Sequence, residues 1–174
     1  IIVDERWNGG GFIPDFFIER LQRKTLSYWS SREGEGFRTP PTAIDGPKCM
    51  LINQYAGSGG DCLPYYFRLA GLGPVIGKRT WGGLVGISRS LPLVDGGSIT
   101  FPDFGFWDPR TGKWEVENHG VDPDIEVENT PESLTNGQDT QLDRAIAYCL
   151  EQLKTNPPKV PQHPAYKVQE GLKK

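Results

Sequence analysis

Histidine, methionine and cysteine are scarce in this sequence, and the shortage limits the chemistry that it can support. Among 174 residues there are two histidines, one methionine and three cysteines. Cys49, Cys62 and Cys149 match no zinc or redox spacing, and their odd number argues against a disulfide framework. We therefore expect no zinc or redox centre, and we expect free thiols, which favour a reducing compartment, the cytoplasm.

Long apolar runs and a strong charge of either sign are also missing. No apolar stretch approaches the roughly 20 residues that span a bilayer, and the formal net charge is −3. This composition favours neither a membrane nor a nucleic acid as a partner. The chain begins at Ile1 within a predicted strand and has no initiating methionine, so we interpret it as a fragment of a longer polypeptide. An export signal upstream would make the protein periplasmic instead.

Glycine, proline and short apolar runs are what the sequence does contain. The 22 glycines and 15 prolines indicate many turns and short elements. Strand–loop–helix units come early, and turn signals at residues 95–97 and 110–112 come late. This order predicts an α/β domain with a mostly parallel central sheet, flanking helices and additional β-hairpins. We assign the domain to residues 1–155 and a proline-rich basic tail to residues 156–174.

The early elements can be placed from their apolar patterns. We expect strands at residues 1–6 and 48–54, helices at residues 12–24 and 61–73, and a mobile loop at residues 33–47. In the first helix Ile13, Phe17 and Leu21 share one face. Asp61 is the expected N-cap of the second helix.

The final predicted helix begins near Asp139. Its apolar stripe consists of Leu142, Ala145, Ile146, Cys149 and Leu153.

Two glycine loops, residues 9–11 and 57–60, follow predicted parallel strands. Binding sites in such sheets form at the carboxyl ends of the strands, so we expect both loops to face one crevice. Ser58 stands between glycines in the second loop, within the sequence NQYAGSGGD. A serine nucleophile needs exposure, a base, oxyanion donors and room for the substrate. The simpler alternative is a structural turn between a strand and a helix.

Oxyanion donors can be named from the sequence, but a base cannot. The Gly59 amide at the head of a helix and the Gly10 amide in the other loop are the candidate donors. His119 lies beside glycine in a turn, and His163 lies in the proline-rich tail. The residues therefore supply a candidate nucleophile, Ser58, without a convincing proton acceptor.

Four segments together resemble the tail-specific and tricorn serine protease family. In chain order they are IIVDERWNGGG, NQYAGSGGDCLPYYF, VIGKRTWGG and VENHGVDPDIEVE. The first segment resembles the family's strand and asparagine–glycine loop. The second segment resembles the family's nucleophile segment and has the tyrosine-rich pattern of the tricorn branch. The last resembles its glycine–x–x–proline–aspartate segment. The resemblance spans about residues 1–128 and implies a ClpP/crotonase-like core.

The resemblance also implies roles for individual residues. Ser58 would be the nucleophile, Gly59 and Gly10 the oxyanion donors, and Glu117 the glutamate that orients the catalytic centre. Gly83 stands where the serine–lysine branch carries its lysine. The tricorn branch instead uses a histidine from an earlier part of the polypeptide, and no such part is present here. We therefore expect one half of a split active site.

The activity implied is cleavage of peptides through an acyl-enzyme on Ser58, which needs neither a metal nor an organic cofactor. The partners implied are preceding β-propeller and PDZ-like domains and further copies in a homo-oligomer. One alternative is a non-catalytic peptide-binding or assembly domain whose glycine loops cradle a chain terminus. The other is an esterase of the α/β-hydrolase type, in which only His163 is available as the base.

Overall fold

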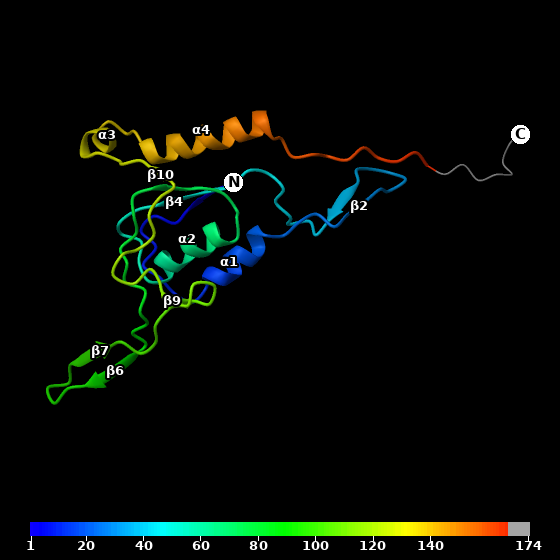
Figure 1. The fold of residues 1–174 in the computed structure, drawn as a ribbon. Helices are drawn as coiled ribbons and strands as arrows, with labels where there is room; N and C mark the ends of the chain where they lie inside the picture. Colours follow the sequence, from blue (N-terminus) through cyan, green and yellow to red (C-terminus); the bar gives the residue numbers. More distant parts are fainter. Residues whose placement is uncertain (167–174) are drawn as a thin grey trace, which may run out of the picture.

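The centre of the protein is a four-stranded parallel sheet. The computed structural model describes residues 1–166, and Figure 1 shows the arrangement of its elements. In spatial order the strands of the sheet are β1 (Ile2–Asp4), β4 (Cys49–Ile52), β5 (Val75–Gly77) and β10 (Ile125–Glu126). Each neighbouring pair is parallel. Strand β10 was not predicted.

Helices cover both faces of this sheet. Helices α1 (Pro14–Leu21) and α2 (Gly59–Leu69) pack on one face, and α4 (Thr140–Thr155) packs on the other (Figure 1). The short helix α3 (Pro131–Thr135) precedes α4. This three-layer arrangement confirms the predicted α/β class with a parallel sheet and flanking helices.

Strand β4 shows why the hydrophobic core lies on both sides of the sheet. All four of its residues are buried. Met50 and Ile52 join the cluster formed with α1 and α2, whereas Cys49 and Leu51 join the cluster formed with α4. The side chains divide in this way because successive residues of a strand point to opposite faces. A continuous apolar run is what a strand covered on both faces requires.

The buried face of α1 differs from the prediction by one position. Pro14, Ile18 and Leu21 are buried, whereas Ile13 and Phe17 are 56% and 47% exposed. Both sets have helical spacing, and over eight residues they lie on adjacent faces. The apolar pattern alone does not distinguish these two faces in so short a helix.

Three antiparallel hairpins accompany the sheet. They are β2 (Ser27–Trp29) with β3 (Phe37–Thr39), β6 (Arg89–Pro92) with β7 (Ser98–Phe101), and β8 (Trp107–Asp108) with β9 (Lys113–Trp114). The β2–β3 and β6–β7 hairpins extend away from the body in different directions (Figure 1). The two later hairpins confirm the predicted turns. The prediction of a loop over residues 33–47 was wrong in part, because β3 lies within it.

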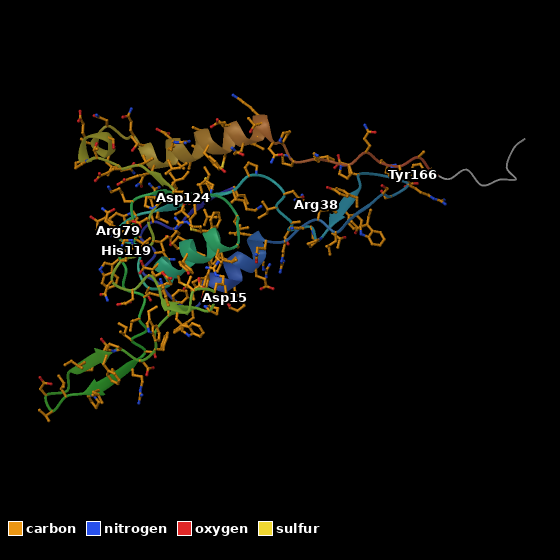
Figure 2. All side chains as sticks on the ribbon, in the orientation of Figure 1. Asp15, Arg38, Arg79, His119, Asp124 and Tyr166 are labelled. Carbon is orange, nitrogen blue, oxygen red and sulfur yellow. The ribbon has the colours of Figure 1, made fainter. Side chains whose placement is uncertain are left out.

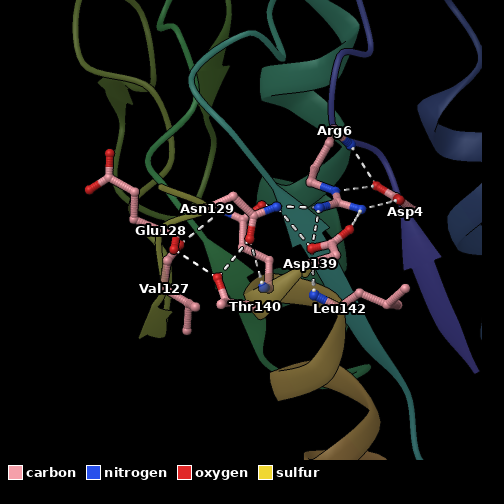
Figure 3. A network of polar contacts seen from close by, with 9 residues as sticks. Asp4, Arg6, Val127, Glu128, Asn129, Asp139, Thr140 and Leu142 are labelled. Atoms are coloured by element: carbon pink, nitrogen blue, oxygen red, sulfur yellow. Dashed lines mark hydrogen bonds and ion pairs between the residues drawn. The ribbon is translucent and has the colours of Figure 1, made fainter. Parts of the chain in front are cut away.

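Arg6 connects the end of β1 to the beginning of α4 through hydrogen bonds and ion pairs (Figure 3). Its Nε donates to Asp4 Oδ1 at 2.9 Å and its Nη1 to Asp139 Oδ1 at 2.9 Å. Asp139 is the N-cap of α4 and accepts the Leu142 amide at 3.0 Å. The hydrogen bond from Arg6 is the main reason why the pKa of Asp139 falls to about 2. These contacts hold the strand immediately before the glycine loop of residues 9–11.

In the last helix, Ala145 and Cys149 of the predicted stripe are buried, whereas the prediction was wrong for Ile146 and Leu153, which are exposed. Residues 157–166 form no helix or strand, and residues 167–174 of the predicted tail lie outside the described residues. The boundary between a domain and a tail at residue 155 stays a prediction. Within residues 1–166, no helix is long and apolar enough to cross a membrane.

Candidate active site

The loops that follow β1, β4 and β5 meet at one edge of the sheet. The Gly57 amide donates to the Asn8 carbonyl oxygen at 2.9 Å, and the Ser58 amide donates to the Gly83 carbonyl oxygen at 3.1 Å. These bonds join the serine loop to the loop on either side of it. The two glycine loops therefore do lie together at the carboxyl ends of the strands, as the sequence predicts.

Ser58 occupies a strained turn. Its φ is +57° and its ψ is −117°, and the Gly60 amide donates to the Gly57 carbonyl oxygen at 2.8 Å. These values match a type II′ turn, in which glycine is the usual residue at this position. A side chain in such a conformation costs of order 1–3 kcal/mol, and such residues cluster at functional sites. The half-buried Ser58 hydroxyl is thus held in place at an energetic cost.

Asp61 is the residue that holds this turn. It is completely buried, and its Oδ2 accepts the amides of Ser58 at 2.8 Å and Gly83 at 3.1 Å. Its Oδ1 accepts the Thr80 hydroxyl at 2.5 Å and the Gly82 amide at 2.8 Å. Four donors thus compensate for the burial of one carboxylate. The predicted role of Asp61 as N-cap was wrong, because Ser58 is the N-cap of α2 and Asp61 lies three residues into the helix.

The glycine loop of residues 9–11 lies directly against the serine. A Cβ on Gly10 would lie 2.7 Å from the Ser58 Cβ and 2.9 Å from its Oγ. Gly10 also has a φ of +109°, which disfavours a side chain there. A Cβ on Gly59 would overlap the Gly11 carbonyl oxygen. Glycine is therefore required on both sides of this contact.

Two backbone amides beside Ser58 are available to a ligand. Within residues 1–166, the amides of Gly59 and Gly11 donate to no protein acceptor. Gly59 is the first residue of α2, where the helix dipole adds positive character. The Gly10 amide, in contrast, donates to Asn8 Oδ1 at 3.0 Å. Of the two predicted donors, Gly59 is free and Gly10 is already engaged.

A cleft of about 550 Å³ opens at Ser58. Ser58, Gly59 and Gly11 line it together with apolar and aromatic side chains, among them Phe12, Leu84, Ile87, Phe104 and Phe106. Asp15 on α1 is the one charged residue among those that line this cleft in the described part of the chain. The mainly apolar wall with a few polar groups is typical of a ligand site.

Cys62 also lines the cleft, one helical turn beyond Ser58. Burial raises the pKa of its thiol. The thiol therefore stays protonated near neutral pH and is a poor nucleophile. Among the cleft residues, this leaves the hydroxyl of Ser58 as the better candidate.

Glu117 does not line the same cleft as Ser58. Its Oε2 accepts the amides of Leu84 and Val85, both at 2.7 Å. It lines a neighbouring cleft of about 400 Å³ together with Val85 and Trp114. Glu117 is therefore connected to the Ser58 cleft through the backbone that follows Gly83, whose carbonyl oxygen accepts the Ser58 amide.

The histidines of the chain lie outside the Ser58 cleft. His119 is exposed, with Nε2 2.7 Å from Asp122 Oδ2 and Nδ1 3.4 Å from Arg79 Nη1. Figure 2 shows it beside Arg79 and away from Asp15. His163 lies in the exposed segment after α4. Neither lines the cleft, and none of the lining residues is a histidine or a lysine.

Gly83 stands where a lysine would complete a serine–lysine pair, and a side chain there would require the exposed Trp81 ring to move. A Cβ at this position would overlap the ring of Trp81. Within residues 1–166, no group of three or more histidine, cysteine, aspartate or glutamate side chains is placed to hold a metal ion.

Comparisons with known proteins point to one group. The profile of peptidase family S41 matches residues 1–127. The tricorn protease of Thermoplasma acidophilum is 42% identical over 165 residues, which make up 95% of this chain and 15% of that protein. A putative tricorn-like protease C-terminal subunit of Sulfurisphaera tokodaii is 43% identical over 153 residues, 88% of this chain and 18% of that protein. The chain thus spans less than a fifth of the length of either relative.

Solved structures give the same result. The crystal structure of the tricorn protease superposes with a TM-score of 0.82 at 44% identity, covering 88% of this chain and 15% of that chain. A putative peptidase from Parabacteroides merdae gives a TM-score of 0.64 at 26% identity, covering 88% of this chain and 53% of that one.

Proposed function

Because this chain belongs to peptidase family S41, we propose that it carries the nucleophile and the oxyanion donors of a serine peptidase. The family membership confirms the resemblance drawn from the four sequence segments. The proposal for this chain is that Ser58 is the nucleophile. The observation that carries it is a serine in a strained turn, beside a free helix-terminal amide, at the mouth of a mainly apolar cleft.

The chemistry follows from these parts. The Ser58 Oγ attacks the carbonyl carbon of a peptide while a histidine from another segment of the full-length protein takes its proton. The histidine then returns the proton to the leaving amine, and an acyl-enzyme remains on Ser58. Water attacks the ester, with the same histidine as base, and releases the second product. No lining residue is a histidine or a lysine, which is why we place the base outside this segment.

The oxyanion forms next to two amides. The Gly59 amide is one donor, and a well-placed donor of this kind is worth roughly 2.7–4 kcal/mol of barrier. The second comes from the glycine loop of residues 9–11. Gly10 serves only if its amide leaves Asn8, so the free Gly11 amide is better placed to act.

Glu117 has a supporting role in this scheme. Its carboxylate holds the Leu84 and Val85 amides, and Leu84 lines the cleft. It orients the cleft through the backbone, and its other oxygen is available to the imported catalytic groups. This role agrees with the orienting function that the resemblance implies.

Partners and location are extensions of the same proposal. We place PDZ-like and β-propeller domains before this segment, and further copies in a homo-oligomer. The β2–β3 and β6–β7 hairpins support such contacts, because they extend from the body with exposed apolar residues such as Trp29, Phe37 and Leu91. Three free cysteines support a cytoplasmic rather than a periplasmic location.

The experiment compares peptide hydrolysis by the full-length protein with that of its Ser58→Ala variant. We expect kcat/KM to fall at least about a thousandfold, because the nucleophile is lost. Thr155→Ala, which removes an exposed hydroxyl at the end of α4, is the control and leaves the rate unchanged. Equal rates for the parent and Ser58→Ala would remove Ser58 from the role.

A serine-directed phosphonate separates catalysis from simple peptide binding. A peptidase forms a covalent adduct that mass spectrometry locates on Ser58. Peptide binding without hydrolysis or adduct would instead support the non-catalytic assembly domain.

A further inference from the structure

Glu5 is a buried carboxyl group that the proposed mechanism does not use. It lies one residue beyond the end of β1 and is only 4% exposed. Its Oε1 is the one buried side-chain oxygen or nitrogen within residues 1–166 that has no hydrogen-bond partner. Burial of an unpaired carboxylate is costly, so its presence needs a physical explanation.

The surroundings of Glu5 favour an uncharged carboxyl group. Burial is the main cause that raises its pKa to about 9; the hydrogen bond from Asn8 lowers the pKa in part, and the negative charges of Asp61 and Asp4 raise it further. The nearby guanidinium of Arg6 does not compensate, because it is engaged with Asp4 and Asp139. At neutral pH the Glu5 side chain is therefore protonated.

Glu5 contacts the glycine loop through Asn8. The Asn8 Nδ2 donates to Glu5 Oε2 at 3.4 Å, a long hydrogen bond, and the Asn8 amide donates to the Glu5 carbonyl oxygen at 3.0 Å. Asn8 Oδ1 accepts the Gly10 amide at 3.0 Å. The Asn8 carbonyl oxygen accepts the Gly57 amide at 2.9 Å. Asn8 thus connects both glycine loops, and Glu5 contacts the end of its side chain.

We propose that Glu5 is a positioning residue, whose carboxyl group accepts from the Asn8 side chain and so fixes the loop of residues 9–11 against Ser58. With Asn8 holding the Gly10 amide, the next peptide unit presents the Gly11 amide to the cleft. This inference rests on the proposed peptidase function, because the direction of these amides matters most if an oxyanion forms there.

The charge state of Glu5 is part of the proposal. Ionised Glu5 would place a second carboxylate near Asp61, the residue that holds the Ser58 turn. An ionised Glu5 would accept from Asn8 more strongly, but the cost of burying the charge and the repulsion from Asp61 and Asp4 outweigh this gain, draw Glu5 toward water and so release Asn8. The loop therefore keeps its arrangement while Glu5 is protonated and loses it when Glu5 ionises.

The first test is the pH dependence of kcat/KM for peptide hydrolysis by the full-length protein and its Glu5→Gln variant. One ionisation with a pKa of about 9 lowers the parent's kcat/KM roughly tenfold between pH 8 and pH 10. Glutamine keeps an uncharged acceptor and does not ionise, so this fall is absent from the variant. The same alkaline fall in both proteins would overturn the proposal.

The second test needs no hydrolytic activity, so it separates this inference from the proposed function. Hydrogen exchange is measured at pH 7 on peptides that cover residues 8–11 of the full-length protein. We expect Glu5→Leu to raise their exchange rate at least about tenfold, because leucine cannot accept from Asn8, while Glu5→Gln keeps them slow. Equal exchange in all three proteins would overturn the role of Glu5 even if Ser58 proves to be the nucleophile. If Glu5→Leu does not fold, the pH profile of Glu5→Gln still decides.

Discussion

Replacing Glu5 with glutamine is expected to stabilise the protein by an amount that grows with pH. The Glu5 carboxyl has a pKa of about 9 in the folded protein, against an ordinary value of 4.5. Between these two values the folded state keeps a proton that the unfolded state has released. Stability therefore falls as pH rises through this window, because the unfolded state gains by ionising and the folded state cannot.

The size of the effect follows from the width of the window. Each pH unit between 4.5 and 9 lowers the free energy of unfolding by about 1.4 kcal/mol for one proton. From pH 4.5 to pH 7 the accumulated loss is about 3 kcal/mol, a large part of a typical domain's stability. Glutamine has no proton to lose, so the Glu5→Gln variant avoids this loss.

The assay is urea denaturation of the chain at pH 4, 5.5 and 7, followed by tryptophan fluorescence. At pH 4, the difference in free energy of unfolding between Glu5→Gln and the parent reflects only the replacement of a neutral carboxyl by a neutral amide. The growth of this difference with pH reflects the ionisation of Glu5. We expect the stability advantage of Glu5→Gln over the parent to grow by about 3 kcal/mol between pH 4 and pH 7. Glu19→Gln makes the same change at an exposed position of α1 and should give no such growth. The reasoning would be refuted if the difference in free energy of unfolding stayed constant with pH, or if the parent became the more stable protein as pH rises.

Three further substitutions test the geometry of the site. In urea denaturation, Ser58→Gly should be more stable than Ser58→Ala by about 1 kcal/mol, because glycine relieves the strain at φ +57°. The flexibility of glycine in the unfolded chain offsets only part of that gain. Equal stability of the two variants would show that the turn is not strained. Asp61→Asn should lower the free energy of unfolding by about 3 kcal/mol. Each carboxylate oxygen of Asp61 accepts two donors, and the variant replaces one of these oxygens with an NH2 group, which cannot accept them. Unchanged stability would show that the donors find other partners. Gly10→Ala should lower the rate of peptide hydrolysis strongly, because the new methyl group would lie 2.7 Å from the Ser58 Cβ. Gly9→Ala is the control and should change the rate far less, because a Cβ at Gly9 has nothing within 4 Å. Similar rates for the two variants would contradict the close contact.

The parts of the fold that the sequence predicts are those with strong local signals. Strand β4 is a continuous apolar run, and the later hairpins carry glycine turns at Gly96 and Gly112. Strand β10 has only two residues, Ile125 and Glu126, and exists because β5 offers an open edge. The buried face of α1 is decided by α2, which packs against it. Such choices depend on partners that are distant in the sequence, so local patterns do not reveal them.

The same distinction applies to the candidate site. Ser58, Gly59 and Gly10 could be named because glycines around a serine after a strand form a local signal, and the structure brings all three together. The role of Asp61 in holding the Ser58 turn could not be predicted from the sequence. Three of its four hydrogen-bond donors come from Thr80, Gly82 and Gly83, which are distant from Asp61 in the sequence. A glutamate within a strand end, such as Glu5, looks in the sequence like an ordinary surface charge. Its burial is visible only once the sheet and α2 are assembled.

The turn at Ser58 has a consequence for which amino acids this position is able to accept. Threonine has the same hydroxyl group, but its branched Cβ is poorly compatible with a φ of +57°. Cysteine has no branch and fits the backbone as well as serine does. The position is therefore open to a change from oxygen to sulfur but closed to one added methyl group.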